Sequence, residues 1–251
     1  MEASPLSGRV NVSLAAYPGL TFHGAMERAV TRMPEEPALG KLKVEETQLC
    51  PQNRGILTRE YADGLRSLYP QTRFRLHANV RVLPSRQILD WSAYGQNPTY
   101  WAALADMSKH LGAPAYTAHA GRRSEASLTQ ILEFARHAEE LFCCPVGIEG
   151  HYPTPNDVFL ISNWGEYRTL FDSGVNYALD LSHLNIVAQQ SQRFETTLVQ
   201  EMLACDRCIE VHVSGNDGTK DQHRALSTHP WWWPLTQYIH PDAVIFSEGV
   251  Q

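Results

Sequence analysis

Eight short runs of apolar and β-branched residues alternate along the chain with longer stretches of helical periodicity. Strands that alternate with helices form parallel sheets, because each connection must cross one face of the sheet to start the next strand. Eight such units are the number that closes a parallel sheet into a (β/α)8 TIM barrel, which is an α/β fold. The expected strands are Arg9–Leu14, Lys43–Thr47, Phe74–Asn79, Ala115–His119, Pro145–Glu149, Asn176–Asp180, Ile209–Val213 and Ala243–Glu248.

The expected helices include Pro98–Leu111 and Ser124–Phe142, and the second places its apolar residues on one face with a period near 3.6 residues. An open, doubly wound sheet would have a glycine-rich phosphate-binding turn after its first strand, and Ala15–Gly19 is not such a turn. No linker or low-complexity tract interrupts the sequence, so we expect a single domain over residues 1–251. Because the sequence ends just after the last expected strand, we expect the eighth outer helix to be absent.

Composition narrows the classes of partner. Lys and Arg total 21 against 27 Asp and Glu, which gives a net charge of −6. Proteins that grip phosphate backbones usually have a basic balance, so nucleic acid is not expected as the main partner. No apolar run is long enough to span a membrane, and no signal peptide is indicated. The five cysteines have no disulfide-framework spacing, which favours a reducing cytoplasm.

Residues of the types that bind metal ions stand at or just after the ends of six expected strands. In a TIM barrel the C-terminal ends of all strands open on the same face, so these residues would converge although they are far apart in sequence. The set is His77, His119, Glu149, Asp180, His183, His212, Asp221, His223 and Glu248.

Nine donors are too many for one ion, because a zinc ion takes about four ligands. They suit two or three divalent ions with a bridging carboxylate, and carboxylates this close together would repel each other unless cations neutralise them. A mixed set of nitrogen and oxygen donors without cysteine is typical of iron, zinc or manganese, and does not choose among them.

The order His, His, Glu, Asp-x-x-His, His, Asp-x-His, Glu resembles the metal-binding pattern of the xylose isomerase-like TIM-barrel superfamily. Within it, the pattern is similar to the trinuclear site of endonuclease IV. It is also similar to the multinuclear iron enzymes that modify ribosomal peptides, the family of the methanobactin biosynthesis oxidase. His212–Gly215 and the tryptophan-bearing Trp231–Leu235 resemble segments of that iron family, whereas His183–Asn185 is closer to endonuclease IV.

The resemblance implies three ion positions, with Glu149 bridging the first two. The implied sets are His77, His119 and Glu149 for the first ion, Glu149, Asp180, His212 and Glu248 for the second, and His183, Asp221 and His223 for the third.

Three functions stay open. The favoured one is oxidation of a peptide or small thiol-containing natural product with iron and O2, in which a separate partner protein would present the peptide. The second is a trinuclear zinc phosphodiesterase of the endonuclease IV type, against which the charge balance argues. The third is a sugar isomerase or epimerase with a single divalent ion and Glu149 and Glu248 as the acid/base pair. It leaves five of the nine donors without a metal role. The catalytic candidates are Glu149, Glu248 and His183.

Basic and amide side chains surround the expected cluster in sequence, which suggests an anionic substrate such as a carboxylate or a phosphate. The candidate substrate-binding residues are Asn79, Arg81, Arg122, Arg123, Asn185, Lys220 and Arg224.

Overall fold

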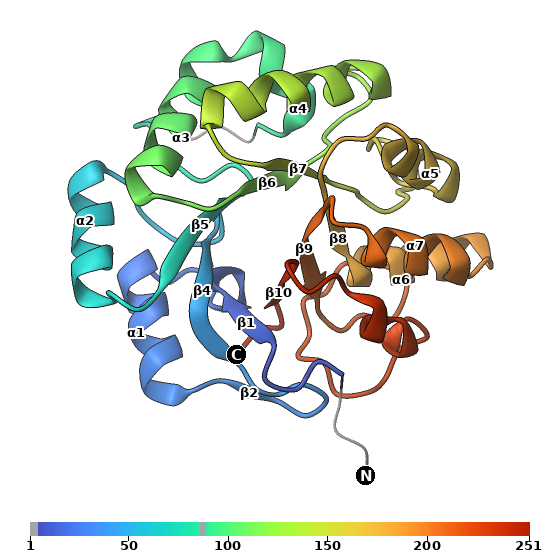
Figure 1. Ribbon diagram of the computed structural model, residues 1–251, viewed down its shortest axis with the longest axis horizontal. Coiled ribbons are helices and arrows are strands. Elements are labelled where there is room, and N and C mark those ends of the chain that lie inside the picture. Colours follow the sequence, from blue (N-terminus) through green and yellow to red (C-terminus); the bar gives the residue numbers. More distant parts are fainter. Residues whose placement is uncertain (1–4, 86–88) are drawn as a thin grey trace.

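The computed structural model describes residues 5–85 and 89–251. Eight parallel strands form a closed barrel in the order β1-β10-β9-β8-β7-β6-β5-β4, in which β1 pairs with both β10 and β4 (Figure 1). These strands are β1 (Val10–Ser13), β4 (Lys43–Leu49), β5 (Arg73–His77), β6 (Tyr116–His119), β7 (Val146–Glu149), β8 (Tyr177–Asp180), β9 (Cys208–Val213) and β10 (Val244–Ser247). The predicted barrel is confirmed, and each strand overlaps the one expected from sequence.

Helices cover the outside of the barrel (Figure 1). They are α1 (Phe22–Arg32), α2 (Arg59–Leu68), α3 (Pro98–Leu111), α4 (Leu128–Phe142), α5 (Trp164–Asp172), α6 (Leu181–Ser191) and α7 (Thr196–Ala204). Three short 3-10 helices, η1 (Leu14–Ala16), η2 (Trp91–Gln96) and η3 (Trp233–Tyr238), and a small antiparallel pair, β2 (Glu35–Glu36) and β3 (Gly40–Lys41), complete the described elements. In the described chain the connection from β9 to β10 contains η3 as its one helical element. None of the helices in the described ranges is long and apolar enough to cross a membrane.

The ends of the helices follow local chemistry. Helix α4 begins at Leu128 rather than at the expected Ser124, because Ser127 and Gln130 form a capping box. The Ser127 hydroxyl accepts from the Gln130 amide at 3.3 Å, and the Gln130 side chain accepts from the Ser127 amide at 2.9 Å. Helix α3 begins at Pro98 and ends before Gly112, which adopts the left-handed conformation that favours glycine.

Alternation along the strands decides what fills the barrel. Side chains two residues apart in a strand point to the same face, so each candidate ligand at a strand end has another interior residue directly below it. Arg75 on β5 and Glu210 on β9 show this, because their strands are not neighbours in the sheet, yet the side chains are 3.0 Å apart across the interior. The interior residues two positions below the strand-end donors are Arg75, Thr117, Gly147, Ala178, Glu210 and Phe246.

Gly121, which follows β6, fixes the approach of the loop that contains Asp90. Its φ is +90°, and a Cβ there would lie 2.1 Å from Ser92 Oγ and 2.9 Å from the Cβ of Asp90. We expect Gly121→Ala to lower the free energy of unfolding by about 2–4 kcal/mol, from backbone strain and overlap together. Gly40→Ala is the control, because Gly40 has a φ of +73° but open space around it, and should cost only about 1 kcal/mol. Urea unfolding measures both, and equal losses would contradict the overlap.

Candidate metal centre

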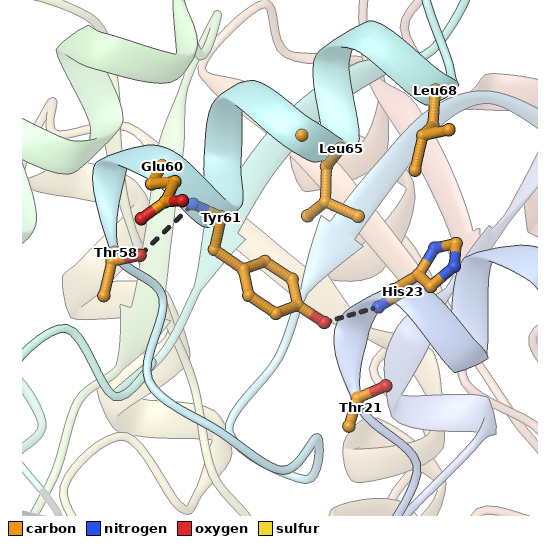
Figure 2. A pocket seen from close by; sticks show the side chains of 8 residues that line it. Thr21, His23, Thr58, Glu60, Tyr61, Leu65 and Leu68 are labelled. Carbon is orange, nitrogen blue, oxygen red and sulfur yellow. Dashed lines mark hydrogen bonds between the residues drawn. The ribbon is translucent and has the colours of Figure 1, made fainter.

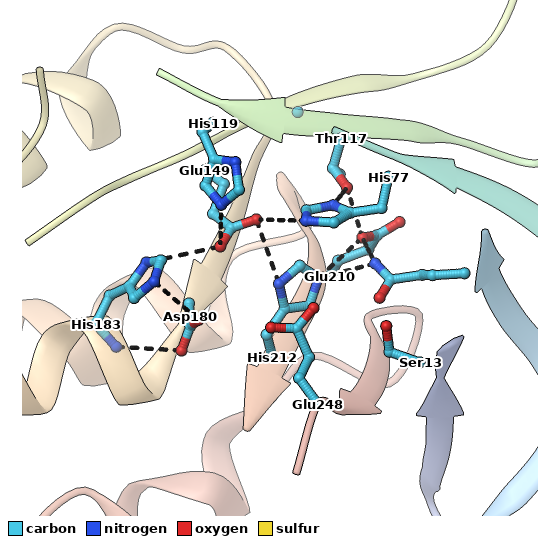
Figure 3. Close-up of polar contacts among 12 residues, drawn as sticks. Ser13, His77, Thr117, His119, Glu149, Asp180, His183, Glu210, His212 and Glu248 are labelled. Atoms are coloured by element: carbon cyan, nitrogen blue, oxygen red, sulfur yellow. Dashed lines mark hydrogen bonds and ion pairs between the residues drawn. The ribbon is translucent and has the colours of Figure 1, made fainter. Parts of the chain in front are cut away.

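A fully buried carboxylate, Glu149 at the end of β7, lies at the centre of the barrel mouth (Figure 3). Four imidazoles from four other segments face it. The nitrogen–oxygen distances are 3.3 Å from His212 Nδ1, 3.5 Å from His77 Nε2, 3.6 Å from His119 Nε2 and 3.7 Å from His183 Nδ1. Neither oxygen of Glu149 has a hydrogen-bond partner among the described residues. A buried charge without hydrogen bonds requires a compensating cation, so the arrangement fits a metal ion.

The remaining candidate ligands extend from this centre toward β10. His183 Nε2 lies 3.4 Å from Asp180 Oδ2 and 3.5 Å from Asp221 Oδ2. His223 Nε2 lies 2.8 Å from the same Asp221 oxygen, and its Nδ1 lies 3.6 Å from Glu248 Oε2. With the four contacts to Glu149, these distances join all nine candidate ligands into one continuous cluster.

Two compact groups within the cluster correspond to two of the expected ion positions. The ligand atoms of His77, His119 and Glu149 all lie within 4.8 Å of one another, and so do those of Glu149, Asp180 and His212. Glu248 of the second expected set is not part of that compact group. Glu149 belongs to both groups, as a bridging carboxylate would. The third expected set, His183, Asp221 and His223, is held together through contacts to Asp221 alone.

The Asp-x-x-His spacing has a local structural cause. Asp180 is the N-cap of α6, and its Oδ1 accepts from the backbone amides of Ser182 at 2.6 Å and His183 at 3.2 Å. This leaves Oδ2 pointing toward the imidazole of His183, the third residue of the helix. One capping interaction therefore positions two candidate ligands.

Two of the histidines are oriented by a contact at one ring nitrogen, Nδ1. His183 Nδ1 donates to the carbonyl oxygen of Gly150 at 2.9 Å, so Nε2 is the nitrogen available to Asp180 and Asp221. His119 Nδ1 lies 3.8 Å from Asp90 Oδ1, which leaves Nε2 toward Glu149. Metal-binding histidines commonly hold their second nitrogen on a carboxylate or a backbone carbonyl in this way.

The carboxylate charges explain why the cluster favours cations. Burial by itself would lower the pKa of the histidines, and at His77 it does so, to about 3. At three other histidines the nearby carboxylates outweigh burial. They raise the pKa to about 8 at His119, about 9 at His223 and about 10 at His183. Burial would raise the pKa of Glu149, but the imidazole charges, that of His212 first, lower it well below its usual value. Metal-free protein therefore keeps protons on these rings, and a bound divalent cation would replace them.

Comparison with known proteins gives the fold. No family model matches the chain, and no curated protein sequence matches it significantly. An AP endonuclease of family 2 from Brucella melitensis is similar in structure at 13% identity, with 96% of this chain and 92% of that chain covered and a TM-score of 0.61. A D-tagatose 3-epimerase-like protein is similar at 13% identity, with 86% and 79% covered and a TM-score of 0.58.

An IolI protein with a bound zinc atom is similar at 10% identity, with 95% of this chain and 88% of that chain covered and a TM-score of 0.61. A xylose isomerase domain protein from Alicyclobacillus acidocaldarius is similar at 11% identity, with 96% and 89% covered and a TM-score of 0.53. The chain has the xylose isomerase-like TIM-barrel fold. The fold expected from the resemblance is thus confirmed.

Two of the candidate substrate-binding residues, Asn185 and Arg224, line a small pocket, and both closely follow candidate ligands in sequence. The pocket has a volume of about 140 Å³, and its walls include Asn185, Ser214, Arg224 and Trp232. The guanidinium of Arg224 at its wall is exposed and carries only N–H donors, which suit a ligand that offers hydrogen-bond acceptors.

The other candidate substrate-binding residues differ in how far their side chains are already paired with other protein groups. Arg123 is engaged by the protein itself, since its Nη2 donates to Glu166 at 2.9 Å and lies 3.1 Å from Asp157. Arg122 is exposed, with its guanidinium 5.8 Å from the ring centroid of Phe159. Asn79 donates to Asp90 at 3.4 Å, Arg81 donates to the carbonyl of Pro84, and Lys220 is exposed.

The structure adds residues that the sequence analysis gave no role. Asp90 reaches His119 from a loop, and no sequence signal identifies it because only the folding of that loop brings it there. His151 is buried, stacks on Phe159 with centroids 4.2 Å apart and on His119 at 4.9 Å, and its Nε2 has no partner among the described residues. Its position two residues after Glu149 was the available signal.

A hollow on the outside of the barrel is separate from this centre (Figure 2). It has a volume of about 420 Å³, and its walls include Thr21, His23, Thr58 and Tyr61 from the α1 and α2 segments. The Tyr61 hydroxyl accepts from the His23 amide at 3.0 Å, which ties the two helices together at this hollow. None of the nine candidate ligands lines it.

The raised histidine pKa values predict an alkaline loss of stability in metal-free protein. A folded-state pKa above the unfolded value of about 6.5 stabilises the fold fully below that pH. The contribution is lost as pH rises through about 8 at His119, about 9 at His223 and about 10 at His183. We expect the Tm of chelator-treated protein to fall between about pH 6.5 and 10.

Saturating zinc should flatten that fall, because the bound cation takes the place of the protons. Thermal unfolding with and without zinc measures the difference. Parallel pH profiles in the two samples would contradict the prediction.

Proposed function

We propose that this chain is a metal-dependent enzyme whose centre holds two or three divalent ions at the mouth of the barrel. The observation that carries the proposal is Glu149, a fully buried carboxylate with both oxygens unpartnered by described residues and four imidazoles facing it. The fold supports it, because active sites of TIM-barrel enzymes lie at this end of the strands. The similar structures include one described with a zinc atom.

The proposed ligand sets follow the two compact groups and the chain of contacts beyond them. Glu149 would bridge the first two ions, and Asp221 would join His183 to His223 around the third. When bound, the ions would supply Lewis-acid chemistry, and iron would add redox chemistry. The protein side chains orient the ligand nitrogens, as Asp90 and the Gly150 carbonyl do for His119 and His183.

Within this function, we propose iron- and O2-dependent oxidation of a peptide or small thiol-containing natural product. His77, His119 and Glu149 are two histidines and one carboxylate, a ligand set that nonhaem iron oxygenases use. The resemblance of His212–Gly215 to the peptide-modifying iron family supports the same choice. The pocket lined by Asn185 and Arg224 would take a carboxylate or carbonyl oxygen of the substrate.

Metal-dependent phosphodiester hydrolysis is the second candidate. The observation that favours it is the structural likeness to the AP endonuclease from Brucella melitensis. The net charge of −6 argues against a surface that grips DNA. A single-ion isomerase is placed below both, because one ion would leave most of the nine converging donors without a metal role.

Metal content and turnover of anaerobically purified protein separate these functions. We expect two or three iron ions per chain and oxygen consumption when a thiol-containing peptide is added. Three zinc ions with cleavage of an abasic-site oligonucleotide would overturn the proposed oxidation in favour of phosphodiester hydrolysis. One manganese or cobalt ion with ketose turnover would overturn oxidation and hydrolysis in favour of isomerisation. Absence of any bound metal would overturn the proposal that the chain is a metal-dependent enzyme.

Glu149→Gln tests the bridging position directly. Loss of the charge and of one oxygen ligand should reduce the bound metal by at least one ion per chain. The affinity for the remaining ions should fall by more than the about 10–100-fold that loss of a supporting residue costs. Glu60→Gln is the matched control, because Glu60 is exposed on α2 away from the cluster. Unchanged metal content in Glu149→Gln would refute the assignment.

A further inference from the structure

Glu210 is a second fully buried carboxylate, two residues below His212 on β9 (Figure 3). Its Oε1 lies 3.0 Å from Arg75 Nη1. Its Oε2 accepts from Gln48 Nε2 at 2.8 Å and Thr117 Oγ1 at 2.8 Å, and lies 3.2 Å from His212 Nε2. Both oxygens are therefore occupied by protein donors, in contrast to those of Glu149. Although Glu210 lies close to His77 and His212, its contacts are those of a supporting group and not of a free ligand.

The contact through Thr117 decides which nitrogen of His77 carries the proton. An ionised carboxylate only accepts hydrogen bonds, so Thr117 must donate its single hydroxyl hydrogen to Glu210. Thr117 Oγ1 can then only accept from His77 Nδ1, which is 3.0 Å away. A neutral His77 is therefore protonated at Nδ1, and its bare Nε2 faces Glu149 at 3.5 Å.

His212 has the opposite orientation. Its Nδ1 faces Glu149 at 3.3 Å, and its Nε2 faces Glu210 at 3.2 Å. The amide nitrogen of Gln48 also lies 2.9 Å from this Nε2. If Nε2 accepted from Gln48, the ring proton would sit on Nδ1 and block the nitrogen that faces Glu149. A proton on Nε2 has Glu210 Oε2 as its acceptor, because Gln48 Nε2 is itself a donor and cannot accept it.

We propose that Glu210 is a positioning residue that sets the tautomers of two metal-binding histidines at once, so that His77 offers Nε2 and His212 offers Nδ1. One carboxylate does this for both rings because it contacts His212 directly and His77 through Thr117. This inference rests on the proposed metal-dependent function. It adds a residue below the ligand layer on which the geometry of that layer depends.

A buried ion-pair network holds Glu210 in place. Arg75 Nε donates to Glu46 Oε2 at 2.6 Å, and Glu46 also pairs with Arg73 at the edge of the network. Arg75 therefore keeps a carboxylate partner when Glu210 loses its charge, which limits the cost of that substitution. Glu46 contacts neither histidine in the described structure, so it serves as a control for the network alone.

The test is ¹⁵N NMR of the histidine side chains in zinc-loaded protein, together with zinc affinity measured by competition with a chelator. In the wild type we expect the proton on Nδ1 of His77 and on Nε2 of His212. Glu210→Gln should lower zinc affinity by about 10–100-fold and mix the tautomers of both rings. Glu46→Gln should lower the Tm but leave the zinc affinity and both ring signals unchanged.

Thr117→Val interrupts the contact of Glu210 with His77 and leaves its contact with His212. It also serves as the test if Glu210→Gln does not fold. It should change the tautomer of His77 and leave that of His212 as in the wild type. Wild-type zinc affinity and unchanged rings in Glu210→Gln, or an unchanged His77 in Thr117→Val, would overturn the inference while the metal centre stands. A wild-type protein that binds no divalent cation would overturn the proposed function and this inference together.

Discussion

The burial of Glu149 without a hydrogen-bond partner is the constraint on which the rest of the site depends. A carboxylate in the barrel interior is stable only if positive charge surrounds it, and four imidazoles converge on it from different segments. The carboxylates around the cluster raise the pKa of three of those imidazoles, His119, His183 and His212, whereas burial lowers that of His77. The cluster therefore holds protons or metal ions, and the choice between them depends on pH and on the metal available.

The site is built in layers along the barrel axis. The ligand layer lies at the strand ends, and the layer below it contains a charged network in place of the branched apolar residues that usually fill a TIM barrel. Buried ion pairs contribute little net stability because desolvation offsets their attraction. Their value here lies in orientation, since Glu210 and Thr117 hold ligand rings as Asp90 and the Gly150 carbonyl do from the sides.

The likeness to solved structures fixes the fold, and the chemistry must be argued from the site itself. Zinc-bound, epimerase-like and endonuclease structures share this barrel, so the architecture is compatible with several reactions. In this chain nine candidate donors form one cluster at the barrel mouth, and Asn185 and Arg224 line a small pocket. The number of converging donors favours a multinuclear centre over a single ion.

The sequence by itself determined the eight strands, because the alternation of apolar residues is local. It also determined the nine candidate ligands, because the cap at Asp180 is local and the closure of eight parallel strands brings their ends together. Alternation could also have identified Glu210, two residues before His212. Only the tertiary structure decided the rest. Arg123 is engaged by Glu166 and Asp157, and Asp90 reaches His119 from a loop. The tautomers of His77 and His212 depend on contacts across the barrel, between strands that are far apart in sequence.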